Sequence, residues 1–367
     1  MNVTIRPSTL EDYDGIAATV SRSGLEMVSH QEYLHRWSTN PFTPADRIGQ
    51  TGWLMQTEAG QIVGWAGNIF AGYEWEGRFL LAAGTHAWAV EDQYRTKSIP
   101  LLASFFRQSG VDLLLDTTAI AKAGQIFTGF KGFRLPRPSY DRVLYWICDY
   151  GRFVGAALHK KQMPLAGILG GAGGIVMSMA DGLRGRNSAR RCPPGEPVAK
   201  LVPDFDARFD AAWQRLRLRR GRLLAIRSRA ALAWHYHDAL QAKRLAIVVL
   251  EEGDSLAGYA ILIRRDAQNI GLRRFVVADL QVLDENPVLV RRLLAGAMEA
   301  ARAHGVHVLE ANGFDSFKHG VLDASNPRIR QSPSWPYFYK AISPPLAQAL
   351  QSVDAWDPCP YDGDAAF

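Results

Sequence analysis

The chain has 367 residues, of which 47% are hydrophobic and 21% charged, as in soluble globular proteins long enough for two domains. Its net charge is +6, and its three cysteines, Cys148, Cys192 and Cys359, are odd in number and widely separated. This excludes a disulfide framework and a cysteine-based zinc cluster, and it favours a reducing cytoplasm. Residues 1–7 lack the pattern of a secretion signal, so we expect a cytoplasmic protein without a metal.

The first half of the chain predicts a hairpin, a long strand, a helix and a further strand. The hairpin turn contains Gly60, and Gly110 ends the helix. In chain order, the predicted elements are the hairpin strands 53–56 and 62–67, the long strand 79–90, the helix 101–108 and the strand 111–116.

The same order of elements returns in the second half. The predicted elements there are the strands 245–250, 255–260 and 275–283, the helix 288–303 and the strand 306–310. Equivalent positions keep a nearly constant spacing, because Gly64 and Gly258 are 194 positions apart and Gly110 and Gly305 are 195 apart. An internal duplication is the simplest explanation.

A basic turn joins the long strand of the first half to its helix. It covers residues 89–99 and reads Ala-Val-Glu-Asp-Gln-Tyr-Arg-Thr-Lys-Ser-Ile. A strand that ends in such a turn and leads into a helix presents backbone N–H groups and the positive end of the helix dipole to an anion. The turn therefore predicts a phosphate-binding site.

Three motifs, together with this order of elements, resemble the acyl-CoA-dependent N-acyltransferases of the GNAT family. They are the opening Val3–Pro7 with Leu10–Tyr13, the turn with Val90 and residues 93–99, and the segment Gly129–Phe133. The resemblance covers residues 1 to about 150, and the duplication extends it to about 340. It implies an α/β (α+β) fold of two tandem GNAT-like domains, each a mixed, mostly antiparallel sheet flanked by helices. Tandem halves also resemble Fem-type aminoacyl transferases and GNAT proteins of surface-polysaccharide clusters.

This resemblance divides the chain into four parts. They are an N-terminal GNAT-like domain (1–155), a Gly-rich apolar linker that ends in a Pro-rich boundary (156–200), a C-terminal GNAT-like domain (201–345) and a tail (346–367). The segment 334–340 resembles the last strand of the second half. The tail from Asp354 onward is acidic and irregular, and we infer no chemistry from it.

The linker contains an uncharged stretch, 162–180, with five glycines and basic residues on both sides. Its length approaches that of a membrane span, and Gly167 with Gly171 and Gly170 with Gly174 form two small-xxx-small pairs. Five glycines make a poor helix in water. The stretch is therefore interpreted as a packed or mobile linker, a segment that touches a membrane surface, or a true span.

The resemblance implies that the basic turn holds the pyrophosphate of acetyl-CoA, the co-substrate. Ser98 and Pro100 stand where the family has glycines, and proline has no N–H, so Arg95 and Lys97 would have to offset the loss. The candidate coenzyme A residues are Val90, Tyr94, Arg95, Thr96, Lys97, Ser98 and Ile99. The second half has the acidic run 283–287 in this place, so we expect one coenzyme A per chain. The alternative is a basic helix start without a ligand.

Two polar residues of the first half are candidates for moving a proton. His86 lies on the long strand, where GNAT enzymes often carry a base, and Asp116 ends the next strand. The alternatives are a packed histidine and a helix-capping aspartate. The family often has a tyrosine general acid before the segment Gly129–Phe133, but Phe127 stands near that place here.

Other polar and aromatic residues are candidates for binding the acceptor. Polar residues that interrupt apolar strands need partners when they are buried, so they are more informative than polar residues in loops. The candidate substrate-binding residues are Trp88, Asp279, Gln281, Glu310, Asn312 and Tyr337. The polar ones would bind sugar hydroxyls, and Trp88 would stack on a sugar ring. Packing in the core is the alternative for the aromatic residues.

These observations lead to an acetyl-CoA-dependent N-acetyltransferase that acts on an amino sugar or sugar-lipid in bacterial surface-polysaccharide synthesis. A lipid-linked acceptor would suit a place at the inner face of the membrane, with contact through 162–180. One alternative is a Fem-type transferase that uses tRNA, supported by the arginine clusters at 215–229 and 184–191, although no nucleic-acid-binding module accompanies them. The other is a non-catalytic binding protein of the same fold.

Overall fold

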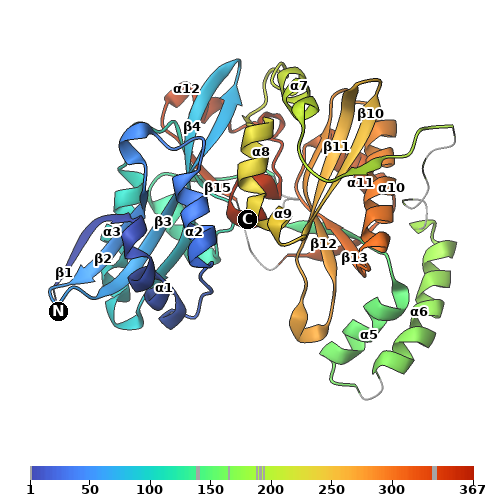
Figure 1. The fold of residues 1–367 in the computed structure, drawn as a ribbon, viewed down its shortest axis with the longest axis horizontal. Helices are drawn as coiled ribbons and strands as arrows, with labels where there is room; N and C mark the ends of the chain where they lie inside the picture. The colour runs from blue at the N-terminus through green and yellow to red at the C-terminus, as the bar shows by residue number, and fades with distance from the viewer. Residues whose placement is uncertain are drawn as a thin grey trace.

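The computed structural model describes residues 2–137, 141–163, 166–186, 189, 192, 195–332 and 337–367. It contains two sheets side by side, each flanked by helices (Figure 1). Four sets of residues singled out from the sequence lie outside the described residues: 164–165 of the uncharged stretch, Arg190 and Arg191, the prolines 193–194, and 334–336 of the expected closing strand.

The first sheet is built mainly from the first half of the chain. Its strands are β1 (Val3–Thr9), β2 (Gln50–Thr57), β3 (Ile62–Trp75), β4 (Arg78–Val90), β5 (Leu113–Asp116), β6 (Phe133–Arg134), β9 (Leu224–Ala225) and β15 (Phe338–Ala341). Their order is β1-β2-β3-β4-β5-β15-β6, and β9 pairs with β3. The predicted hairpin, long strand and further strand are confirmed as β2, β3, β4 and β5.

Helices cover both faces of the first sheet. They are α1 (Tyr13–Arg22), α2 (His30–Ser38), α3 (Ser98–Phe106) and α4 (Ala121–Gly129). Successive residues of a strand point to opposite faces, and Leu54 and Met55 of β2 show this clearly. Leu54 packs in one cluster with Ile16 of α1, and Met55 packs in another with Leu101 of α3. The turn between β4 and α3 therefore enters the helix on the face opposite α1.

The second sheet repeats this plan with its own helices. Its strands are β7 (Arg142–Ile147), β8 (Lys200–Val202), β10 (Leu245–Glu252), β11 (Ser255–Arg264), β12 (Arg274–Val282), β13 (Val308–Ala311) and β14 (Arg328–Gln331), in the order β14-β7-β13-β12-β11-β10-β8. The helices of this half are α7 (Ala207–Leu216), α8 (Arg229–His235), α9 (His237–Gln241), α10 (Pro287–Ala303) and α11 (Ser316–Ala324), and α12 (Pro344–Ala349) follows them. The predicted strands and helix of the second half are confirmed.

A bulge in the equivalent strand of both sheets supports the duplication, although the two bulges lie one residue pair apart when Gly64 is aligned with Gly258. In β4, Gly67 pairs with His86 and Ala66 with Trp88, so Ala87 is the extra residue. In β12, Leu262 pairs with Val277 and Ile261 with Asp279, so Ala278 is the extra residue. Each bulged strand also forms the parallel pair of its sheet, β4 with β5 and β12 with β13. The chain thus consists of two tandem halves of one fold.

The two halves exchange strands. β7 comes from the first half but lies in the second sheet, between β13 and β14, whereas β15 comes from the end of the chain and pairs with β5 of the first sheet. The expectation that the closing strand belongs to the second half is therefore wrong. Alternation of apolar residues predicts that a strand exists but does not identify its partner, and Phe338 finds its apolar neighbours, among them Phe127, in the first half. The domain limits drawn from the sequence stay a prediction.

Most of the Gly-rich stretch 162–180 forms one helix, and this helix pairs with the preceding helix in a hairpin. α5 (Tyr150–Lys160) and α6 (Ala166–Leu183) pack together beside the second sheet, where Asp181 of α6 pairs with Arg328 (Figure 1). A Cβ atom at Gly174 would lie 2.6 Å from the backbone N of Gly151, and one at Gly170 would lie 2.8 Å from the Cα of Gly155. Close backbone contact between the helices explains these glycines, which propensity alone counts against a helix.

No helix among the described residues combines the length and the apolar character that crossing a bilayer requires.

We expect the glycines of α6 to differ in their tolerance of a methyl group. Gly174→Ala places its Cβ against backbone atoms of α5, so the helices must separate, with a loss of about 1–3 kcal/mol. The matched control Gly171→Ala has no heavy atom within 4 Å of its Cβ and should gain up to about 1 kcal/mol from helix propensity. Hydrogen exchange of the α6 amides measures both effects. Equal protection in the two variants would contradict the packing described.

Candidate functional site

A cavity of about 360 Å³ opens where β4 and β5 diverge. The last pair between these parallel strands is Gly84 with Leu115, and the bulge at Ala87 then changes the course of β4. Polar residues line the cavity near this point, apolar side chains of α3 and α4 line another part, and residues 25–28, between α1 and α2, line a third. Its lining includes Thr85, His86, Trp88, Leu102, Phe106, Asp116, Thr118, Ile126, Phe127 and Asp364. His86, Asp116 and Trp88, singled out from the sequence on separate grounds, thus face one space.

Asp116 has an unusual environment for a carboxyl group. It lies at the end of β5, is 8% exposed, and accepts a hydrogen bond from the Thr118 backbone N–H at 3.3 Å. Burial and the nearby charge of Asp364 raise the pKa of Asp116 to about 7. A carboxyl group with this pKa in a cavity can take up and release a proton near neutral pH, as a general base must.

His86 is held at both ring nitrogens. Its Nε2 lies 3.1 Å from Nη1 of the buried Arg36, and because a guanidinium only donates hydrogen bonds, Nε2 must accept. We therefore assign the proton of the neutral ring to Nδ1, which lies 3.4 Å from Oδ2 of Asp364. Burial lowers the pKa of His86, and Asp364 only partly opposes this. In this arrangement His86 orients Asp364.

Asp364 lies in the C-terminal tail, residues 346–367, for which the sequence predicted no chemical role. Its Oδ1 accepts hydrogen bonds from the hydroxyls of Thr118 at 2.9 Å and Thr117 at 3.3 Å. Burial works against its ionised form, but His86 and the two hydroxyls hold the pKa of Asp364 below its usual range. Asp364 and Asp116 thus line one cavity with pKa values displaced in opposite directions, which is the pattern expected of a base and its fixed neighbour.

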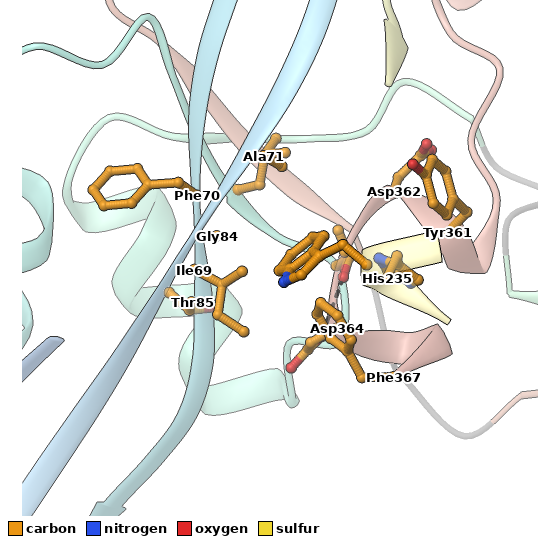
Figure 2. A pocket seen from close by; sticks show the side chains of 14 residues that line it. Ile69, Phe70, Ala71, Gly84, Thr85, His235, Tyr361, Asp362, Asp364 and Phe367 are labelled. Carbon is orange, nitrogen blue, oxygen red and sulfur yellow. Dashed lines mark hydrogen bonds between the residues drawn. The ribbon is translucent and has the colours of Figure 1, made fainter. Parts of the chain in front are cut away.

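The tail packs between the two halves. Figure 2 shows a small pocket in which Asp364 and Phe367 meet Thr85 of β4 and His235 of α8. The Phe367 ring stacks on His235 with 4.2 Å between the ring centroids. Asp362 is buried in the same region, and burial raises its pKa to about 7. The aromatic and proline-containing run 356–361 was a signal in the sequence that this tail is buried.

The basic turn could hold an anion through its side chains, but it has few backbone N–H groups left to donate. Residues Asp92–Lys97 form a 3-10 turn, and α3 begins at Ser98. The backbone N–H and the hydroxyl of Ser98 both donate to the carbonyl of Arg95, the hydroxyl at 2.7 Å. Arg95 is exposed and pairs with Asp92 at 2.7 Å. Of the other candidates, Thr96 and Ile99 are exposed, Lys97 is half-buried, and Val90 and Tyr94 pack in the core.

In the second half, a buried ion network fills the corresponding space. The third residue of α4 is Ala123, which lines the cavity, whereas the third residue of α11 is Lys318, which is fully buried. The Lys318 Nζ donates to the carbonyl of Leu280 at 2.9 Å and to Oδ2 of Asp357 at 2.5 Å. Two other candidates, Asp279 and Gln281, lie in this network. Asp279 accepts from Arg227 at 2.8 Å, and Gln281 donates to Asp279 and to Asp357.

The acidic turn of the second half also has partners. Arg222 lies 2.9 Å from Glu285, and Arg215 lies 3.6 Å from Asp284. Part of the arginine cluster at 215–229 therefore neutralises this turn. Since the turn carries acid and the space behind it is filled, the second half lacks the features that make the first half a candidate for binding an acyl-CoA.

A second cavity, of about 300 Å³, lies between the halves, and most of the residues that line it are polar or charged. Its lining includes Thr117, Thr118, Arg265, Arg274, Glu310, Asn312, Arg330 and Ser332. Arg330 and Arg274 both contact Oε2 of Glu310, at 2.8 Å and 3.4 Å, so two positive charges share one carboxylate. Thr118 lines both cavities. Glu310 and Asn312 thus lie together in the second cavity, while Tyr337 is buried in the core.

Within the described ranges, no group of histidine, cysteine, aspartate and glutamate side chains is arranged to hold a metal ion.

Comparison with known proteins finds similarity in structure only. No family model matches the chain, and no curated protein matches its sequence. The chain is similar to a GCN5-related N-acetyltransferase from Anabaena variabilis, with a TM-score of 0.55 and 12% identity over 93% of this chain and 73% of that one. It is also similar to a probable N-acyltransferase from Enterococcus faecalis, with a TM-score of 0.58 and 12% identity over the same shares.

A third similar structure is the N-myristoyltransferase of Saccharomyces cerevisiae with bound myristoyl-CoA. Its TM-score is 0.53, with 10% identity over 93% of this chain and 80% of that one. At these identities the likeness shows the fold and not the activity. The resemblance to the GNAT fold, first seen in three short motifs, is thereby confirmed over most of the chain.

Proposed function

We propose that this chain of GNAT fold is an acyl-CoA-dependent N-acyltransferase, with acetyl-CoA as its donor. One observation carries the proposal: the carboxyl group of Asp116, whose pKa is about 7, faces an apolar cavity at the divergence of two parallel strands. Transfer of an activated acyl group to an amine needs a placed donor, a placed acceptor and a base. Asp116 supplies the base.

The residues around the first cavity fit a coenzyme A thioester. Leu102, Phe106 and Ile126 provide an apolar wall for an extended arm. The Trp88 Nε1 is buried and has no hydrogen-bond partner among the described residues, so it is a donor suited to a carbonyl oxygen of the ligand. When bound, the thioester supplies an acyl group that is already activated. Arg95 and Lys97 would contact its phosphates from the adjoining turn.

The side chains of the site divide the proton chemistry among them. Asp116 takes a proton from the acceptor amine, and Asp364 raises the proton affinity of Asp116. His86 and Arg36 keep Asp364 in place, so His86 acts here as a positioning residue. Phe127 cannot donate a proton to a departing thiolate. The protonated Asp116 lies in the same cavity and can return its proton there.

The second cavity is the proposed acceptor site. Glu310 and Asn312 can bind sugar hydroxyls. The positive charges of Arg274 and Arg330 suit an anionic group on the acceptor. Asp279, Gln281 and Tyr337 are buried in the core and do not line this cavity. The proposed acceptor is an amino sugar or a sugar-lipid of surface-polysaccharide synthesis. The reaction would then take place in the cytoplasm, and for a sugar-lipid at the inner face of the membrane.

One alternative has a specific observation in its favour. The N–H of Ser98 is already used and Pro100 has none, which weakens the turn as a phosphate site and suits a non-catalytic binding protein. The displaced pKa of Asp116 favours the enzyme. A Fem-type reaction with tRNA is less well supported, because several arginines of the 215–229 cluster already pair with acidic residues.

A thiol-release assay with acetyl-CoA and a panel of amino sugars tests the proposal. We expect turnover by the parent protein. In the double variant Arg95→Ala with Lys97→Ala, the KM for acetyl-CoA should rise about tenfold or more and kcat should change little. The reason is that the lost charge-assisted hydrogen bonds would hold the phosphates of the donor and would contribute to its binding, not to the chemical step. Arg291→Ala removes an exposed charge from α10, the counterpart helix of the second half, and serves as the matched control. An unchanged KM in the double variant would exclude the turn as the phosphate site.

A further inference from the structure

The hairpin of α5 and α6 presents an apolar face that the described residues of the chain leave exposed. On one side of α6, Gly170 and Gly174 contact α5, and Asp181 faces the body of the protein, where it pairs with Arg328 at 2.8 Å. The opposite side carries five large apolar residues that are exposed, and the last three of them follow one another at steps of three and four. They are Leu169 (44% exposed), Ile175 (60%), Val176 (69%), Met179 (66%) and Leu183 (92%). Water contact over this whole stripe is unfavourable, so the stripe is expected to have an occupant.

Charge around this stripe has one dominant sign. Between residues 150 and 186 there are five basic residues and one acidic residue, Asp181, which is buried. Lys160 and Lys161 are exposed where α5 ends, and Arg184 is exposed where α6 ends. The basic groups therefore lie at both ends of the apolar stripe, and the stripe itself contains no charge. Apolar surface with basic flanks matches the interface of a bilayer that contains anionic lipid.

We propose that the outer face of α6 lies on the surface of an anionic membrane, with Lys160, Lys161 and Arg184 at the level of the lipid headgroups. The helix rests in the interface and does not cross it, since its other side is occupied by α5 through close glycine contacts. A second copy of the chain is the other candidate occupant. Packing two such faces together would bring basic ends close to one another or leave them without partners, which charge disfavours.

Vesicle flotation with the full chain tests this proposal without reference to any activity. We expect the protein to float with vesicles of phosphatidylcholine and phosphatidylglycerol and to bind pure phosphatidylcholine much more weakly. Val176→Asp with Met179→Asp should reduce binding at least tenfold, because two charges would enter the apolar layer. Lys160→Gln and Lys161→Gln should each weaken binding to the anionic vesicles by roughly fivefold.

The control variant is Leu218→Asp, because Leu218 is 76% exposed in the segment after α7 and lies outside the hairpin. It should float like the parent protein. Since these side chains are exposed, thermal unfolding of all variants should match the parent, and this excludes misfolding as the cause of lost binding. The proposal is overturned if the parent does not float with anionic vesicles, or if the Val176 and Met179 variant floats equally well. Light scattering that shows a dimer dissolved by that variant, without vesicle binding, would assign the face to a second copy.

Discussion

Asp116→Asn is expected to lower kcat/KM for acyl transfer by about 10²- to 10⁴-fold, the usual contribution of a general base. Asparagine has nearly the same shape as aspartate, and its side-chain oxygen can still accept the hydrogen bond from the Thr118 backbone N–H. The cavity and its binding of the acyl donor should therefore remain. The loss should appear in kcat, with little change in the affinity for acetyl-CoA.

The role of Asp116 as a base also predicts the direction in which kcat/KM changes with pH. A base acts in its deprotonated form, so kcat/KM of the parent should fall about tenfold per pH unit below pH 7 and reach a plateau above it, in line with the pKa of Asp116 near 7. Asp364→Asn removes a negative charge that helps to raise this pKa. Its profile should shift to lower pH, with a midpoint still above that of an ordinary aspartate because burial remains. If Asp116→Asn keeps the parent activity and profile, Asp116 is not the base.

Lys318→Met is expected to destabilise the protein by about 3–5 kcal/mol, the range found when one partner of a buried ion pair is removed. Lys318 is 0% exposed and Asp357 is 3% exposed, so the variant leaves a carboxylate buried without its main cation. Burial alone would raise the pKa of Asp357, but Lys318 and Arg227 hold it well below its usual range. The free energy of unfolding in urea at pH 7, followed by tryptophan fluorescence, measures the loss.

A double variant is the control for this second prediction. Lys318→Met with Asp357→Leu replaces both partners by apolar side chains, so it should be more stable than the sum of the single changes predicts. The same change should not restore a second site for acyl-CoA, because Asp279 and Arg227 still fill the core there. A stability of Lys318→Met within 1 kcal/mol of the parent would mean that the network does not hold this half together.

The central elements of each half could be predicted from the sequence. The hairpins, the long strands and the helix after each of them follow from apolar periodicity and from a glycine near the end of each helix: Gly305 directly follows the C-cap of α10, whereas α3 ends at Phe106, before Gly110. The exchange of β7 and β15 could not be predicted, because a short apolar strand satisfies its pattern in either sheet. The helix α6 could not be predicted from helix propensity, because its glycines are favoured by close packing against Gly151 of α5, a contact that propensity does not include.

Only those residues of the candidate site that lie on strands could be predicted from the sequence. His86 and Asp116 stand out because polar side chains interrupt apolar strands, and the structure brings them into one cavity. Asp364 and Arg36 reach that cavity from distant parts of the chain, and sequence spacing carries no information about such contacts. The ion network of Lys318, Asp357 and Arg227 was missed for the same reason, and it explains why the second half differs from the first.

Calorimetric titration of the chain with acetyl-CoA tests the central claim most directly. The account predicts one molecule bound per chain, with binding weakened about tenfold or more by Arg95→Ala with Lys97→Ala and unchanged by Asp116→Asn. Absence of binding, or two molecules per chain, would contradict it.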